Sequence, residues 1–98
     1  MAGARERLVR ELGRFLVCLG YAPSNLNAGL YQEMRNQSPT AQRLQLVHER
    51  LGGYPVWSEQ FQRELEGFSA NLTEARRTGR RASSEIDAAL QDPRWAAP

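Results

Sequence analysis

Apolar residues recur every three or four positions along most of the chain, and this spacing predicts helices. The longest stripe follows a strict alternation of four and three over the last third of the sequence, through Phe61, Leu65, Phe68, Leu72, Ala75, Gly79, Ala82, Ile86 and Ala89. Because this spacing keeps one side of a helix facing one way over many turns, it is typical of a surface that another helix covers. We therefore expect an all-α protein, a small bundle of four helices with a long C-terminal helix.

Helix caps and helix breakers place the boundaries of these elements. Ser24, Ser38 and Ser58 are the expected N-caps, because a serine hydroxyl accepts a hydrogen bond from a free amide of the first turn. Gly20 and Gly52 are the expected terminators. One domain over 1–98 is predicted, with helices over 5–19, 24–36, 38–51 and 58–90 and a tail over 91–98.

The fourth predicted helix is long for a bundle of this size. At 1.5 Å per residue it would extend for about 50 Å, which is more than the three shorter helices cover. Either the helix breaks or bends near Gly79, with a new start at Ser83 or Ser84, or a second subunit covers the excess. The unbroken register of the stripe favours a continuous helix, so a homodimer is expected.

Three small residues, Ala75, Gly79 and Ala82, follow one another on this stripe and would let another backbone approach closely. This close crossing could lie within the subunit or between subunits, and the sequence leaves both open. The candidate interface comprises Phe61, Leu65, Phe68, Leu72, Ala75, Gly79, Ala82 and Ile86.

Four arginines, Arg76, Arg77, Arg80 and Arg81, fall on the side of the same predicted helix opposite the small residues. They could bind phosphate, nucleic acid or an acidic protein surface, or form a solvated face balanced by neighbouring acids. Acidic residues precede and follow the cluster, so two antiparallel copies would set opposite charges against each other. This complementarity also favours a homodimer.

A short connection rich in aromatic residues precedes the fourth predicted helix. Tyr54, Val56 and Trp57 lie there beside Pro55, just after a pair of glycines. Tyrosine and tryptophan are the residues most enriched in binding hot spots, so these three are candidate partner-binding residues. The alternative is that Trp57 folds inward over the end of the bundle.

Composition restricts the class of protein. The 98 residues are 41% hydrophobic and 24% charged, the balance of an ordinary globular domain, and the net charge is only +2. All basic residues are arginine. Cys18 is the single cysteine, which excludes an internal disulfide, and no apolar run approaches the ~20 residues of a membrane span. A cytoplasmic protein without membrane contact is expected.

Catalysis is the function class that the sequence supports least. His48 is the only histidine and has no second ligand at helical spacing, and neither a phosphate-binding loop nor a nucleophile motif is present. We expect no metal, no cofactor and no enzyme activity. The predicted function is a small protein-binding regulator of the inhibitor, anti-activator, antitoxin or immunity type. The alternatives are a nucleic-acid-binding regulator that uses the arginine cluster, or a structural subunit of a larger assembly.

Overall fold

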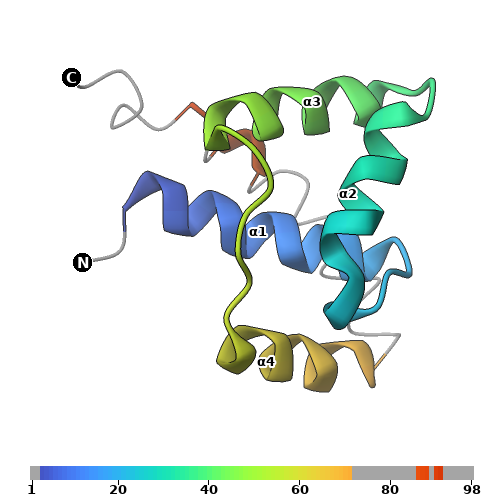
Figure 1. The fold of residues 1–98 in the computed structure, drawn as a ribbon, viewed down its shortest axis with the longest axis vertical. Helices are drawn as coiled ribbons and strands as arrows, with labels where there is room; N and C mark the ends of the chain where they lie inside the picture. Colours follow the sequence, from blue (N-terminus) through green and yellow to red (C-terminus); the bar gives the residue numbers. More distant parts are fainter. Residues whose placement is uncertain (1–2, 72–85, 89, 92–98) are drawn as a thin grey trace.

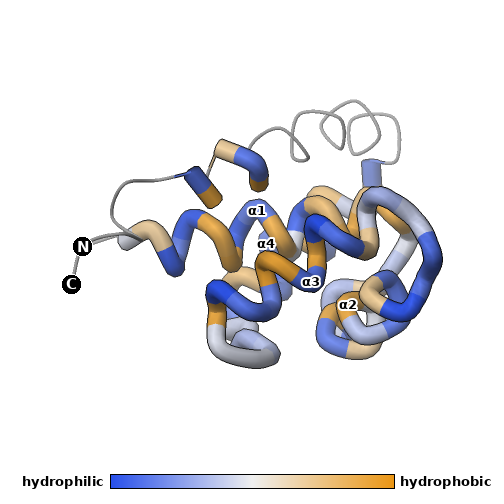
Figure 2. The backbone as a smooth tube through the Cα atoms, turned by 90° about the horizontal axis from the view of Figure 1, so that it is seen from above, coloured by the Kyte–Doolittle hydropathy of each residue, from blue (hydrophilic) through white to orange (hydrophobic). Residues whose placement is uncertain are grey.

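The first helix, α1, lies between the other helices in the computed structural model, which describes residues 3–71, 86–88 and 90–91 (Figure 1). It spans Ala4–Cys18, which agrees with the predicted helix within one residue at each end. Leu8, Leu12 and Leu16 are completely buried. Figure 2 shows apolar and polar residues alternating along α1, as expected for a helix with one buried face. Within the described ranges, every regular element is a helix.

The helix ends follow local chemistry. Gly20 and Gly52 have φ values of 106° and 74°, in the left-handed region that glycine tolerates, and each ends a helix as predicted. Ser38 caps α3, which spans Pro39–Leu51, because its hydroxyl oxygen accepts a hydrogen bond from the Ala41 N–H at 3.2 Å. Ser58 caps α4 in the same way, accepting from the Phe61 N–H at 3.1 Å. Both serine caps are thus confirmed.

The second helix begins later than predicted. A short 3-10 turn, η1 (Pro23–Asn25), comes first, and α2 spans Leu26–Arg35. The Asn25 N–H donates to the Ala22 carbonyl at 2.9 Å, which closes this tighter turn after Pro23. Ser24 therefore lies inside η1 and does not cap α2, and that prediction was wrong.

The predicted long helix over 58–90 also differs from the structure. α4 spans only Glu59–Ser69, with Ala70 as its C-cap, and Asn71 is no longer helical. The physical reason lies in the local sequence, because Gly67, Ser69 and Asn71 are all weak helix formers within one and a half turns. The expected break point near Gly79 lies outside the described residues, as do 92–98 of the predicted tail.

The core gathers residues from all four labelled helices and from residue Ile86. The short helical stretch over 86–88 is joined to α3 by Arg43, whose guanidinium contacts the Asp87 carboxylate at 2.8 and 3.2 Å. α2 packs against α3 and α1, while α4 packs against α1 and η1. This arrangement leaves the link between α3 and α4 to pass across α1 (Figure 1).

The apolar stripe of the last third packs within the chain wherever the structure describes it. Phe61 and Leu65 are buried, Ile86 is 0% exposed, and Phe68 is half-buried against the same core. These side chains are therefore covered by helices of their own chain. The rest of the stripe lies outside the described residues: Leu72, Ala75, Gly79, Ala82 and Ala89.

Candidate functional site

The link between α3 and α4 contains a stretch without helix or strand over residues 54–58, which we call the 54–58 segment and which is drawn out between the two helices in Figure 1. Gly52 and Gly53, both with positive φ, turn the chain out of α3 just before it. Pro55 is buried and Trp57 is half-buried, whereas Val56 between them is 96% exposed. Side chains thus alternate between the two faces of the segment, as they do along a strand.

Asn27 on α2 holds this segment in place with both ends of its side-chain amide. Its Nδ2 donates to the Pro55 carbonyl at 3.1 Å, and its Oδ1 accepts from the indole N–H of Trp57 at 3.0 Å. Gln62 on α4 adds a third bond, from Nε2 to the Trp57 carbonyl at 3.1 Å. The segment is therefore fixed to the helices although its outer face is open to solvent.

Trp57 packs inward, which is the alternative role that the sequence allowed for it. Its ring stacks on Phe61, with centroids 5.9 Å apart and planes at 20°. Both rings lie against the backbone of α1 at Gly13, where a Cβ atom would come within 2.9 Å of Trp57 Cζ3 and 2.7 Å of Phe61 Cε2. Glycine is needed at this position because of that close approach.

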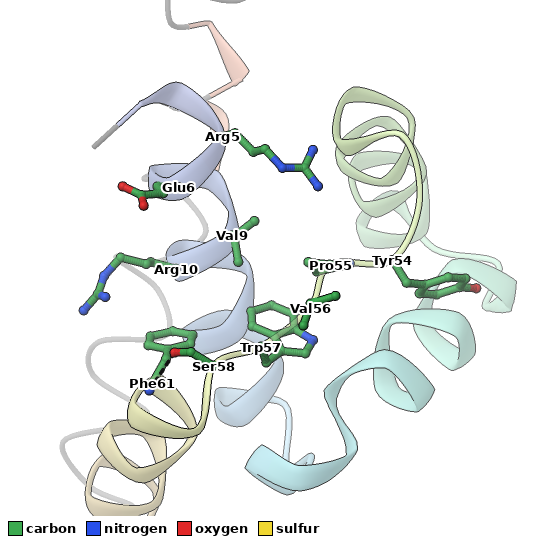
Figure 3. Close-up of a pocket in the computed structure, with 10 residues that line it drawn as sticks. All are labelled: Arg5, Glu6, Val9, Arg10, Tyr54, Pro55, Val56, Trp57, Ser58 and Phe61. Atoms are coloured by element: carbon green, nitrogen blue, oxygen red, sulfur yellow. Dashed lines mark hydrogen bonds between the residues drawn. The ribbon is translucent and has the colours of Figure 1, made fainter. Parts of the chain in front are cut away.

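A groove of about 660 Å³ separates the 54–58 segment from the N-terminal half of α1 (Figure 3). We call it the α1 groove. Val9, Trp57 and Phe61 supply apolar surface, and Val9 points toward the segment. A smaller hollow of about 320 Å³, lined by η1, the start of α2 and Gln62, borders the other side of the segment. The exposed Val56 therefore stands between two hollows.

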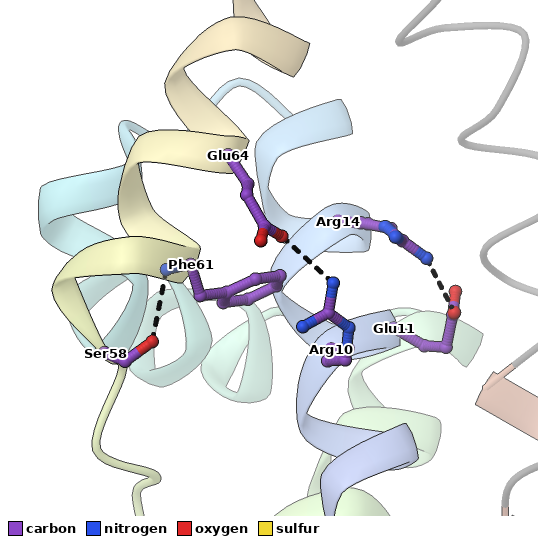
Figure 4. A network of polar contacts seen from close by, with 6 residues as sticks. All are labelled: Arg10, Glu11, Arg14, Ser58, Phe61 and Glu64. Atoms are coloured by element: carbon purple, nitrogen blue, oxygen red, sulfur yellow. Dashed lines mark hydrogen bonds and ion pairs between the residues drawn. The ribbon is translucent and has the colours of Figure 1, made fainter. Parts of the chain in front are cut away.

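Charged side chains surround the α1 groove. Arg5 reaches toward the segment, and its Nη1 donates to the Leu51 carbonyl at 2.6 Å (Figure 3). Arg10 is paired with Glu64 at 3.0 Å and lies over the Phe61 ring, 4.9 Å from its centroid (Figure 4). This ion pair is half exposed, so it orients the two side chains more than it stabilises the fold.

Of the predicted partner-binding residues, the structure brings Tyr54, Val56 and Trp57 together on the 54–58 segment. Tyr54 is exposed and meets the imidazole of His48 edge to face, with centroids 4.8 Å apart. His48 is partly buried. The arginine cluster, Arg76, Arg77, Arg80 and Arg81, lies outside the described residues.

Sequence reasoning missed the wall of the α1 groove and the residue that anchors the segment. Arg5 and Val9 lie in the predicted helix over 5–19 and Asn27 in the one over 24–36, and the sequence pattern gives none of them a binding role. Only Val9 carried a signal, as an apolar residue that directly follows the buried Leu8 and so lies beside the main stripe. Their grouping depends on contacts between residues far apart in the sequence.

Among residues 3–71, 86–88 and 90–91, no three histidine, cysteine or acidic side chains group as a metal ion would need. No helix in that part of the chain is long and apolar enough to cross a membrane. Cys18 is half-buried, and burial raises the pKa of its thiol, which lowers its reactivity at neutral pH.

Comparison of the chain with protein-family models, curated proteins and solved structures finds no match to any of them.

Proposed function

We propose that this protein binds another protein through the 54–58 segment and the α1 groove, and thereby alters that protein's activity. The observation that carries the proposal is Val56, an apolar side chain 96% exposed on a segment that the rest of the fold holds in place. Single exposed apolar residues are common, but this one stands beside a groove with apolar walls. An apolar side chain held beside a groove offers a partner protein apolar surface to bury.

A binding role also fits the chemistry of the groove better than catalysis. The described residues that line it include no histidine, cysteine or aspartate, and the Ser58 hydroxyl is used as a helix cap. Of its two arginines, Arg10 is paired with Glu64, and Arg5 donates one N–H to the Leu51 carbonyl. Because Cys18 has no second cysteine to pair with inside the chain, we also propose a reducing compartment such as the cytoplasm.

The test compares two aspartate substitutions at exposed apolar positions. Val56→Asp changes the proposed surface, whereas Leu46→Asp changes an exposed leucine on α3 that lines neither hollow. Purified wild type is used to capture proteins from a native lysate, followed by mass spectrometry. We expect one stoichiometric partner that is retained by Leu46→Asp and lost by Val56→Asp. A partner bound equally by both variants, or no partner, would contradict the proposal.

The homodimer remains a separate prediction, and one of its two premises does not hold for the described residues. Its main premise was a helix too long to be covered by its neighbours, and α4 ends at Ser69. Its second premise, segregated charge around the arginine cluster, concerns residues outside the described ranges. Light scattering at micromolar concentration tests it directly, because a dimer has twice the mass of the 11.1 kDa chain.

Nucleic-acid binding through Arg76, Arg77, Arg80 and Arg81, and an inert structural role, remain the alternatives. A shift of labelled duplex that weakens steeply with salt and disappears when the four arginines become alanine would favour the first of these.

A further inference from the structure

The backbone of the 54–58 segment has one occupied edge and one open edge. In extended backbone the N–H and C=O groups of alternate residues point to the same side. The Pro55 and Trp57 carbonyls accept hydrogen bonds from the side chains of Asn27 and Gln62, which both line the smaller hollow. The N–H and C=O of Val56 therefore point to the opposite edge of the segment, and Val56 also lines the α1 groove.

These groups of Val56 are unpaired in the part of the chain that the structure describes. No hydrogen bond joins its N–H or C=O to residues 3–71, 86–88 or 90–91, and the residue is almost fully exposed. Tyr54, which shares this edge, has no backbone partner there either. An unpaired strand edge is a template for a second extended chain.

The side chains along the open edge add a charge preference. Arg5 uses one N–H on the Leu51 carbonyl, and its other donors have no partner among the described residues. Arg10 is already paired with Glu64, and Glu6 points away from the 54–58 segment (Figure 3). The uncompensated charge that faces the segment is thus the guanidinium of Arg5, whose donors fit a carboxylate.

We propose that the partner binds as an extended peptide segment that pairs with the backbone of Val56, places an apolar side chain in the α1 groove and sets an acidic side chain on Arg5. This inference rests on the proposed function and specifies the chemistry of the partner. A partner helix fits less well, because its backbone groups are already paired with one another. It would cover the N–H and C=O of Val56 without bonding to them, and burying unpaired polar groups costs free energy.

The experiment selects binders from a phage-displayed library of random linear 12-residue peptides on the purified full chain. Val56→Pro removes the backbone N–H, and Val56→Ala is its matched control, which removes most of the side chain but keeps the N–H. Arg5→Gln removes the charge. We expect selected peptides in which apolar residues alternate with others and include an acidic residue. Their affinity should fall about tenfold for Val56→Pro and for Arg5→Gln, and less for Val56→Ala.

Two further measurements guard against misfolded variants and indirect effects. Circular dichroism should show unchanged helix content in all three variants, since none of them changes a buried residue. Hydrogen exchange of the Val56 amide, followed by NMR in the wild-type chain, should slow when a selected peptide binds. This second readout does not depend on any substitution.

Several outcomes would overturn the inference. The first is that the selected peptides have apolar residues at helical spacing and bind Val56→Pro as tightly as wild type. The second is that hydrogen exchange of the Val56 amide is unchanged when a selected peptide binds. The third is that no recovered peptide distinguishes the variants from wild type. A natural partner lost by Val56→Asp but retained by Val56→Pro would overturn the extended mode alone and leave the proposed function intact. A natural partner that is insensitive to Val56 would overturn both.

Discussion

Gly13→Ala is the substitution that tests the packing behind the 54–58 segment most directly. A Cβ atom at Gly13 would lie 2.7 Å from Phe61 Cε2 and 2.9 Å from Trp57 Cζ3, whereas carbon atoms in good contact are about 3.5–4.0 Å apart. Neither ring can move freely, because Phe61 is buried and Trp57 is bonded to Asn27. Such overpacking costs about 1–3 kcal/mol.

The same substitution has a favourable part, so a control is needed to separate the two. Replacing glycine by alanine inside a helix gains about 1 kcal/mol, which leaves a net loss of about 0–2 kcal/mol for Gly13→Ala. Gly67 in α4 is exposed, and a Cβ there meets nothing within 4 Å. Gly67→Ala should therefore be stabilising, and the difference between the two variants isolates the overpacking cost.

Urea unfolding followed by circular dichroism measures this difference, and thermal unfolding repeats it, since 1 kcal/mol moves Tm by about 4–8 °C in a domain of this size. In a Trp95→Phe background, Trp57 is the single tryptophan, and its emission should shift to longer wavelength in Gly13→Ala as the ring is displaced. If Gly13→Ala stabilised the chain as much as Gly67→Ala and left the emission unchanged, the close approach of α1 to these rings would be refuted.

Three further predictions concern other contacts. Asn27→Ala removes two hydrogen bonds to the 54–58 segment and should destabilise the fold by about 1–3 kcal/mol. An unchanged urea midpoint and unchanged Trp57 emission would show that these two hydrogen bonds do not stabilise the fold. Asp87→Asn breaks a partly exposed ion pair with Arg43 and should cost no more than about 1 kcal/mol, less in high salt; a much larger loss would mean that the pair is desolvated. Burial raises the pKa of the Cys18 thiol, so the folded state favours the protonated thiol. The contribution of this protonated thiol to the free energy of unfolding is present below the unfolded-state pKa and is lost as the pH rises above it. Alkylation of this thiol by iodoacetamide at pH 8 should accordingly be slower in the folded chain than in urea, and equal rates would contradict its burial.

Local chemistry in the sequence was enough to place several element ends. Ser38 and Ser58 cap helices, and Gly20 and Gly52 end them, because capping and positive φ depend on a few adjacent residues. The error at Ser24 arose from the same kind of reasoning, since a serine after a proline serves a 3-10 turn equally well. Cap residues indicate where a turn begins and leave its type open.

The long helix could not be judged from its apolar stripe. Phe61 and Leu65 on α4 and Ile86 in a separate stretch all belong to one core. The regular spacing therefore indicates which residues are buried and does not show whether one helix runs unbroken between them. The candidate site was predictable only in part for a similar reason. The aromatic residues around Val56 were visible in the sequence, but Arg5 and Asn27 join them through contacts that form only when α1 and α2 pack.

The burial of Ile86 has a consequence for how this protein is made. Leu8 on α1 and Ile86 lie near opposite ends of the printed sequence, and both belong to one core. During translation, which adds about 5–20 residues per second, the earlier helices emerge from the ribosome well before Ile86 does. Until then the nascent chain has an incomplete apolar core, and the apolar surface that Ile86 later covers is exposed to aggregation.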